Sequence, residues 1–403
     1  MDYNAKAEYN LKEYITPLWD TNIIVNETVM FSDWDDTEFM NEIVNASIET
    51  LFEDPVRVKK LLYPAEEIYA VYSSDLKTEY IKGKDWDILD GKLVRYYNSD
   101  IPLMTEEIYY PENPEEGHYF GSTVEGHKNI MFGENDFMTK WQVSVTYRHS
   151  GTWEGSLPTI QSEKIKNFIK KLENGEEATI LFYGDSITTG ANSSGAIGVE
   201  PHAPSFAQMI TDFIAEKYGY TVSKEADPFN RNLTEKPLSG EKVLHYINTA
   251  VGGTDSAWGI RELEHRVLAY APDLMVLGFG MNEGGSNMET FTASITDLVG
   301  KVQSACPETE TVLVATMLPH FRVSGFYRKQ YQHEDALKDM VKNSTELNTS
   351  KIAVAEVTSA HKYVLEHKEY YDMTGNNVNH PNDFLARIYA MVILRTMFGD
   401  YME

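Results

Sequence analysis

The pattern of apolar and polar positions divides the chain into two unlike parts. In the first part, segment 140–150 alternates most clearly, with a period of two residues. One set of alternate positions holds Trp141, Val143, Val145 and Tyr147, and the other holds Gln142, Ser144 and Thr146. This period predicts an antiparallel strand whose polar face meets solvent.

A tight turn is also predicted in this part of the chain. Asp90 and Gly91 separate two short apolar runs within segment 85–97, and this dipeptide tolerates positive φ. We therefore expect a β-hairpin centred on these two residues. Together with the alternating segment, it predicts an all-β, sandwich-like accessory domain for residues 1–150.

The period changes after Gly151. Apolar residues then recur at helical spacing, at Ile165, Phe168, Ile169 and Leu172. Ser162 is placed to cap the start of this helix and Gly175 to end it. We interpret the helix as the entry into a second domain, residues 151–403.

Strands and helices alternate through this second part. Strands are expected at 178–184, 243–247, 274–277, 311–317 and 352–355, and helices near 205–217, 260–267, 295–302, from about 329, and at 385–392. Short connections between alternating elements favour a parallel sheet with helices on both faces. The prediction is a three-layer α/β domain.

Composition narrows the classes of ligand and partner. The 403 residues suffice for two domains with real cores, and 62 acidic against 35 basic residues give a formal charge of −27. This charge disfavours nucleic acid and anionic membrane surfaces and suits a neutral ligand. Cys306 is the only cysteine, which excludes an internal disulfide and a Cys-rich metal site.

The N-terminal segment is acidic and polar, whereas a secretory signal has a basic start and an apolar core. Nothing later in the sequence approaches the length of a membrane span. We therefore expect a soluble, cytoplasmic protein.

The candidate chemistry begins at the end of the first strand of the α/β part. The apolar run stops at Gly184, and Asp185 and Ser186 follow it. Residues just beyond the carboxyl end of a central strand lie where open α/β sheets place their ligands. Ser186 is therefore the candidate nucleophile.

A serine nucleophile needs a base and donors for the developing oxyanion, and candidates for each follow later strands. Gly252 and Gly253 can bring a backbone N–H close to a substrate, and Asn282 carries a side-chain amide donor. His380 stands in a loop just before the last helix. Each residue alone has a bland structural explanation, but all occur in order at the same predicted edge of the sheet.

These residues resemble the SGNH, or GDSL-type, esterases and lipases. Gly184-Asp185-Ser186 is similar to the first motif of that family, Asn248 with Gly253 to the second, and Gly280-Met281-Asn282 to the third, with His380 in the last. The resemblance covers about residues 178–400. It implies a flavodoxin-like, doubly wound sheet and an oxyanion hole formed by the Ser186 N–H, the Gly253 N–H and the Asn282 side chain.

The sequence departs from the family pattern at two positions. Glu283 stands where an aspartate usually follows the third-motif asparagine, and Asn377 replaces the acid three residues before His380. An amide can orient an imidazole but cannot offset its positive charge. We expect a Ser-His dyad oriented by Asn377 or a backbone carbonyl, with Asp372 as the first substitute acid and Asp383 as another.

The resemblance extends to bacterial carbohydrate acetylesterases with an N-terminal β-sandwich, which implies O-acetyl groups on xylo- or manno-oligosaccharides as substrate. Trp153 and Trp258 are candidate sugar platforms, although a packing role is the favoured reading of each. The reaction needs no metal or organic cofactor.

Other functions stay open from the sequence alone. The same site suits a broader short-chain arylesterase, thioesterase or lipase. The absence of an acid at position 377 also fits a carbohydrate-binding protein that has lost catalytic activity. The N-terminal part has three candidate roles, as a wall of the pocket, as a dimerising surface in a homo-oligomer, or as a sugar-binding surface.

Overall fold

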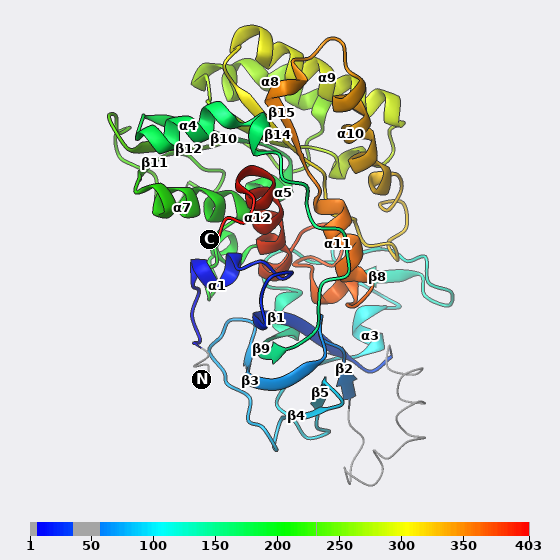
Figure 1. The fold of residues 1–403 in the computed structure, drawn as a ribbon. Coiled ribbons are helices and arrows are strands. Elements are labelled where there is room, and N and C mark those ends of the chain that lie inside the picture. Colours follow the sequence, from blue (N-terminus) through cyan, green and yellow to red (C-terminus); the bar gives the residue numbers. More distant parts are fainter. Residues whose placement is uncertain (1–5, 35–56, 231, 403) are drawn as a thin grey trace.

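The computed structural model describes residues 6–34, 57–230 and 232–402. Its two parts lie against each other, the N-terminal sheets on one side and the α/β part on the other (Figure 1). In the described ranges, no helix combines the length and apolar character needed to cross a bilayer.

The N-terminal part is rich in β-structure, as predicted. Its main sheet has the order β3-β9-β1-β6, and a three-stranded sheet, β2-β5-β4, and a two-stranded sheet, β7-β8, lie beside it. The strands are β1 (Ile23–Ser32), β2 (Arg57–Lys59), β3 (Ala65–Ser73), β4 (Trp86–Leu89), β5 (Lys92–Arg95), β6 (Leu103–Met104), β7 (Tyr119–Gly121), β8 (Asn129–Met131) and β9 (Gln142–His149). Among the described residues of this part, α1 (Leu11–Ile15) and α3 (Glu106–Tyr109) are short α-helices.

The predicted hairpin is confirmed between β4 and β5. Asp90 and Gly91 form its turn with φ of 47° and 76°. A Cβ on Gly91 would lie 2.8 Å from the Cβ of Pro64. Glycine is therefore required here both for the backbone conformation and for the close approach of Pro64.

Strand β9 is confirmed, but the expectation that its polar face meets solvent is wrong. Gln142, Ser144 and Thr146 are buried. Their partners are protein groups: the Asn26 N–H donates to Thr146 Oγ1, and Gln142 Nε2 donates to the carbonyl of Tyr371 in the α/β part. Alternation indicated the strand, but its polar side chains are buried: Thr146 contacts β1, Gln142 contacts the α/β part, and Gln142 and Ser144 line a cavity between the two parts.

The α/β part is a doubly wound parallel sheet with the order β11-β12-β10-β13-β14-β15. Its strands are β10 (Ala178–Gly184), β11 (Thr221–Ala226), β12 (Val243–Asn248), β13 (Leu274–Gly278), β14 (Glu310–Val314) and β15 (Ile352–Ala355). The next two strands along the chain, β11 and β12, lie on one side of β10, and the later strands lie on the other. In open α/β sheets such a reversal marks the edge at which ligands bind, which here is the carboxyl end of β10.

Helices cover both faces of this sheet (Figure 1). One face packs against α4 (Lys166–Asn174), α7 (Phe206–Tyr218), α11 (Val357–Leu365) and α12 (Asp383–Phe398), and the other against α8 (Ser256–Arg266), α9 (Met288–Ala305) and α10 (His333–Asn343). The short α5 (Ser186–Thr189) and α6 (Ser194–Ile197) follow β10. Strand β11 and helix α11 were not predicted.

The start of the first helix of this part differs from the prediction. Ser162 opens a 3₁₀ turn, Ser162–Lys164, and α4 begins only after Ile165, which offers no side-chain cap. Gly175 ends α4 in the left-handed conformation, as predicted. Ser205 caps α7 by accepting a hydrogen bond from the Gln208 N–H at 3.3 Å.

The hydrophobic core runs through both parts of the chain. On β10, Ile180 and Phe182 enter one core and Leu181 and Tyr183 the other, so the strand is buried on both faces. The first of these cores also contains residues of β1 and β9. The domain boundary at residue 150 stays a prediction.

Candidate functional site

Ser186 lies directly beyond β10, at the first position of α5. Asp185 is extended and caps this helix, accepting a hydrogen bond from the Ile187 N–H at 3.0 Å. A Cβ on Gly184 would lie well inside 3.0 Å of the Gly278 carbonyl on β13. Only glycine lets the two strands approach this closely, and the sharp turn after it presents Ser186.

The structure brings Ser186 and His380 together, as the sequence predicted. His380 Nε2 lies 2.9 Å from Ser186 Oγ, and both residues are almost completely buried. The backbone of His380 is fixed on both sides: its N–H donates to Asn376 Oδ1, and its carbonyl accepts from Thr374 Oγ1, each at 3.0 Å. A serine hydroxyl in this geometry can pass its proton to the imidazole.

The other ring nitrogen of His380 faces two residues that the sequence analysis missed. Nδ1 lies 2.7 Å from Asn192 Oδ1 and 3.3 Å from Glu134 Oε2. Asn192 follows α5 and Glu134 comes from the loop between β8 and β9, in the N-terminal part. Asn192 adopts a φ of 64°, which asparagine tolerates better than most residues.

The Glu134 carboxylate is anchored as well as directed at the ring. Its Oε1 accepts a hydrogen bond from Asn376 Nδ2 at 3.2 Å. Burial acts to raise the pKa of Glu134, but the hydrogen bonds and charge from His380, with hydrogen bonds from Asn376 and Asn192, outweigh it and lower that pKa. The carboxylate is therefore ionised beside the imidazole at neutral pH.

Asn377 does not orient His380, which corrects the first expectation for this role. With a φ of 68°, Asn377 turns toward the N-terminal part. Its Oδ1 accepts a hydrogen bond from the Tyr109 hydroxyl at 3.0 Å, and its Nδ2 donates to the Met131 carbonyl at 2.9 Å. The side chain anchors the loop that carries His380.

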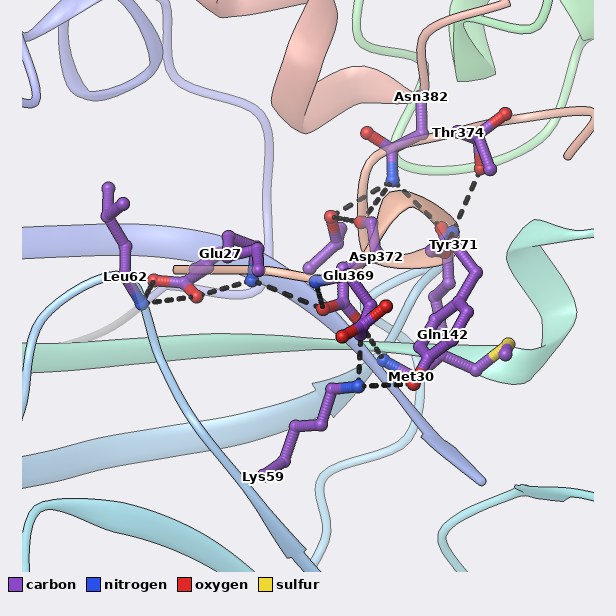
Figure 2. Close-up of polar contacts among 12 residues, drawn as sticks. Glu27, Met30, Lys59, Leu62, Gln142, Glu369, Tyr371, Asp372, Thr374 and Asn382 are labelled. Carbon is purple, nitrogen blue, oxygen red and sulfur yellow. Dashed lines mark hydrogen bonds and ion pairs between the residues drawn. The ribbon is translucent and has the colours of Figure 1, made fainter. Parts of the chain in front are cut away.

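Asp372 is not the missing acid either, because its carboxylate binds strand β1 (Figure 2). Its Oδ1 accepts from the Met30 N–H at 2.8 Å and lies 3.6 Å from Lys59 Nζ. Its Oδ2 accepts from the Glu369 N–H at 3.1 Å and lies 4.0 Å from Lys368 Nζ. The side chain is fully buried, so this ionic contact docks the histidine loop onto the N-terminal sheet.

Asn382 closes the same loop from the other end (Figure 2). Its Nδ2 donates to Gln142 Oε1 at 3.0 Å, to Thr28 Oγ1 at 2.9 Å and to the Asp372 carbonyl at 2.9 Å. Asp383, next in the chain, accepts from the Ser194 N–H at 2.8 Å, and burial raises its pKa to about 6. The polar residues around His380 therefore hold its loop against β1 and β9.

The three expected oxyanion donors come from segments at one end of the sheet. The Ser186 N–H is at the start of α5, where helix donors have no intrahelical partner. Gly253 has a φ of 74°. Its neighbour Gly252 lies close to Ser186, because a Cβ placed on Gly252 would be 3.6 Å from the Cβ of Ser186. Asn282 Nδ2 donates to the Thr254 carbonyl at 2.8 Å, which ties the loops after β12 and β13 together.

Two further motif residues support these loops. Asn248 Nδ2 donates to the Thr188 carbonyl in α5 at 2.9 Å. Glu283 Oε1 accepts from the Ser256 N–H at 2.9 Å and from the Ser256 hydroxyl, and burial raises the pKa of Glu283. Burial, with a contribution from the charge of Glu283, also raises the pKa of Asp185 to about 7.

Both candidate sugar platforms are engaged in packing. Trp258 lies against Tyr183, with ring centroids 6.1 Å apart, and under the guanidinium of Arg266. Trp153 packs on Tyr363, with ring centroids 4.0 Å apart. These contacts agree with the favoured packing role of each tryptophan.

A cavity of about 470 Å³ lies between the two parts of the chain, beside Asn192. Many of its lining residues carry hydroxyl or amide groups, among them Asn26, Thr28, Gln142, Ser144, Ser194 and Asn382, and charged residues such as Asp136 and Lys140 line it as well. Such walls can hydrogen-bond a hydroxylated, neutral molecule. Ser186 and His380 do not line this cavity.

Comparisons with known proteins identify a family and several similar structures. The sequence pattern of the GDSL-like lipase/acylhydrolase family matches residues 182–387. No protein with a curated description matches the chain. Among solved structures, one similar protein is a two-domain esterase active on acetylated mannans, co-crystallised with mannopentaose, with 20% identity and a TM-score of 0.43.

That similarity covers 60% of this chain and 54% of the other, so the chain spans about half the length of that esterase. A second similar structure is Axe2, an acetylxylan esterase from Geobacillus stearothermophilus, with 15% identity and a TM-score of 0.40 over 55% of this chain and 94% of that one. A third is LAE5, an α/β hydrolase from the metagenome of Lake Arreo, Spain, with 13% identity and a TM-score of 0.41 over 55% and 95%.

Proposed function

The chain belongs to the GDSL-like lipase/acylhydrolase family, and we propose that it is a serine esterase that removes O-acetyl groups from xylo- or manno-type oligosaccharides. The observation that carries the proposal is the 2.9 Å contact between Ser186 Oγ and His380 Nε2. Ser186 is the nucleophile and His380 the general base. Asn192 orients the ring.

In the first step, Ser186 Oγ attacks the acetyl carbonyl carbon while its proton passes to His380 Nε2. The Ser186 and Gly253 N–H groups and the Asn282 side chain hold the tetrahedral oxyanion. The intermediate then collapses: the bond to the sugar oxygen breaks, and that oxygen leaves with the proton from His380. The product is an acetyl-serine enzyme.

In the second step, water replaces the sugar. His380 Nε2 takes a proton from this water, whose oxygen attacks the acetyl carbon, and the same donors hold the second oxyanion. Collapse breaks the bond to Ser186 Oγ, which takes back the proton from His380. Acetate leaves and the free serine is restored.

Asn192 has a defined part in both steps. Its Oδ1 accepts the Nδ1 proton of His380 at 2.7 Å, which leaves Nε2 without a proton and able to accept one from Ser186. A neutral amide fixes this tautomer by hydrogen bonding alone.

The cavity beside Asn192 supports sugar binding next to the site. Hydroxyl and amide side chains in its lining can hydrogen-bond the hydroxyl groups of an oligosaccharide. The net charge of −27 also favours a neutral substrate over an anionic one.

The test is hydrolysis of 4-nitrophenyl acetate, butyrate and octanoate by the wild type and by Ser186→Ala, with acetate release from acetylated xylo- and manno-oligosaccharides measured in parallel. We expect the acetyl ester to be the best of the three aryl esters. Ser186→Ala should be inactive on all substrates while it keeps the circular dichroism spectrum of the wild type.

Three results would contradict the proposal in different ways. If Ser186→Ala were as active as the wild type, the serine mechanism would be ruled out. A preference for octanoate would favour a lipase. Binding of acetylated oligosaccharides by a folded wild type without turnover would favour a retired, carbohydrate-binding protein.

A further inference from the structure

The imidazole of His380, the proposed base, lies beside a carboxylate from a distant segment of the chain. Glu134, in the loop between β8 and β9, places Oε2 3.3 Å from His380 Nδ1, although 246 residues separate the two along the sequence. The motif position that usually supplies this charge holds Asn377, whose hydrogen bonds go to Tyr109 and Met131. The ring nitrogen therefore has an amide partner, Asn192, and a carboxylate partner from the other part of the molecule.

These two partners have different physical effects. The amide oxygen of Asn192, at 2.7 Å, makes the shorter hydrogen bond and sets the tautomer. It carries no net charge, so it cannot offset the positive charge that the ring acquires when it takes the proton of Ser186. A carboxylate at 3.3 Å can, because opposite charges at this distance attract even across a partly solvated gap.

We propose that Glu134 is the acidic positioning residue of the site, and that the N-terminal β-rich part thereby completes the catalytic machinery of the α/β part. This inference rests on the proposed esterase function. It gives the N-terminal part a role in the reaction itself, in addition to the candidate roles as pocket wall, sugar-binding surface or dimerising surface that the sequence leaves open.

The loop that carries Glu134 is bound to the catalytic loops by several contacts. Asn376 Nδ2 donates to Glu134 Oε1 at 3.2 Å. Asn192 Nδ2 donates to the Asn135 carbonyl at 3.1 Å and to the Gly375 carbonyl at 3.3 Å. Asn192 thus connects the Glu134 loop, the histidine loop and the ring of His380. These contacts hold the carboxylate of Glu134 and the imidazole of His380 in fixed positions relative to each other.

The charge is partly exposed, which limits the expected effect. The Glu134 side chain is 46% exposed, so solvent screens its attraction for the imidazolium more than it would screen a buried aspartate. We therefore expect loss of the charge to lower kcat by about 10- to 100-fold, less than the roughly 10⁴-fold cost of removing a buried triad charge.

The effect of Glu134 on the site must be distinguished from the effects of other acidic groups nearby. Asp185 precedes Ser186, with a pKa of about 7, and Asp383 accepts a hydrogen bond from the Ser194 N–H, with a pKa of about 6. Asp372 is directed to β1 and to Lys59 and Lys368. All three remain in every Glu134 variant, so a difference from the wild type reports on Glu134.

The experiment compares the full-length wild type with Glu134→Gln and Glu134→Asp. A matched control is Glu125→Gln, which removes the same charge from an exposed position between β7 and β8. The readouts are kcat and KM on 4-nitrophenyl acetate from pH 5 to 9, together with an NMR titration of the His380 imidazole. The titration needs no turnover.

We expect Glu134→Gln to lower kcat with little change in KM. Because it removes a charge that favours the imidazolium, the acid limb of the kcat profile and the midpoint of the His380 titration should both move to lower pH. Glu134→Asp should restore part of each effect, and Glu125→Gln should match the wild type.

The inference is overturned if Glu134→Gln keeps the wild-type kcat and acid limb. It is equally overturned if kcat falls but neither the acid limb nor the His380 titration moves, since that pattern indicates a purely structural role. If the wild type hydrolyses no ester, the proposed function fails, while the NMR titration still decides whether Glu134 and His380 are coupled.

Discussion

Replacement of Asp372 by asparagine separates the docking role of this residue from the catalytic role that its sequence position suggests. Asp372, Glu27, Lys59 and Lys368 form a buried ionic cluster between the histidine loop and the N-terminal sheet, of which Figure 2 labels the first three residues. Lys368 Nζ lies 2.5 Å from Glu27 Oε1, and both of these side chains are fully buried. The cluster contains two carboxylates and two ammonium groups, so its charges balance.

Asp372→Asn keeps the shape of the side chain but leaves one positive charge of this cluster without compensation. It also places an amide NH₂ opposite backbone donors, because both carboxylate oxygens accept N–H bonds, from Met30 and Glu369. Removal of one partner from a buried ion pair costs about 3–5 kcal/mol. Since a typical domain is stable by about 5–15 kcal/mol, we expect a large fraction of the free energy of unfolding to be lost.

The assay is equilibrium unfolding in urea at pH 7, followed by tryptophan fluorescence, with kcat on 4-nitrophenyl acetate measured without urea. We expect the free energy of unfolding to fall by about 3–5 kcal/mol. The folded fraction should keep kcat within about tenfold of the wild type, whereas loss of a triad acid costs about 10⁴ in rate. Unchanged stability with a 10⁴-fold loss of kcat would refute the docking role and restore Asp372 as the catalytic acid.

Three further substitutions test individual residues. Gly184→Ala forces a Cβ into the Gly278 carbonyl, so we expect a loss of about 1–3 kcal/mol in stability and a fall in ester hydrolysis as Ser186 shifts. Thermal unfolding measures the first effect and the aryl-ester assay the second. Unchanged values would contradict the close approach of the two strands. The pKa of Asp185 is about 7 when folded and its ordinary value is 3.8, so its contribution to stability is complete below about pH 4 and is lost as pH rises through 7. Asp185→Asn should therefore gain about 4 kcal/mol relative to the wild type between pH 4 and 8, measured by urea unfolding, and parallel pH curves would argue against this shift. Asn377→Ala removes a buried side chain that accepts a hydrogen bond from the Tyr109 hydroxyl and donates one to the Met131 carbonyl. It should cost about 1–3 kcal/mol with kcat largely retained, whereas a 10⁴-fold loss of kcat would make Asn377 the orienter after all.

Local signals in the sequence carried the prediction of the catalytic pair. An apolar run that ends at Gly184 indicates a buried strand and a sharp turn, and Ser186 follows it within two residues. His380 was found because it precedes the last predicted helix, at the same edge of the sheet. Both inferences depend on short segments and on the rule that parallel strands end at one edge.

The partners of His380 Nδ1 carried no such signal. Asn192 lies six residues after Ser186, and only its polar side chain in the loop after the motif could have made it a candidate. Glu134 belongs to a loop of the other part of the chain, one of 62 acidic residues, and nothing near it in sequence connects it with a histidine 246 residues away. Asn377 and Asp372 had the favoured sequence positions, but the turn at Asn377 and the ionic cluster at Asp372 direct both side chains to the N-terminal sheet.

The sequence by itself determined most of the elements and the order of the chemistry along the chain: the parallel sheet, the hairpin at Asp90 and Gly91, and the positions of Ser186 and His380. These depend on backbone conformation and on burial along one element, which a few neighbouring residues fix. Only the tertiary structure decided that the polar face of β9 is buried and that Glu134 meets His380. Both depend on which surfaces pack together, and that choice is made by many weak contacts between segments far apart in sequence.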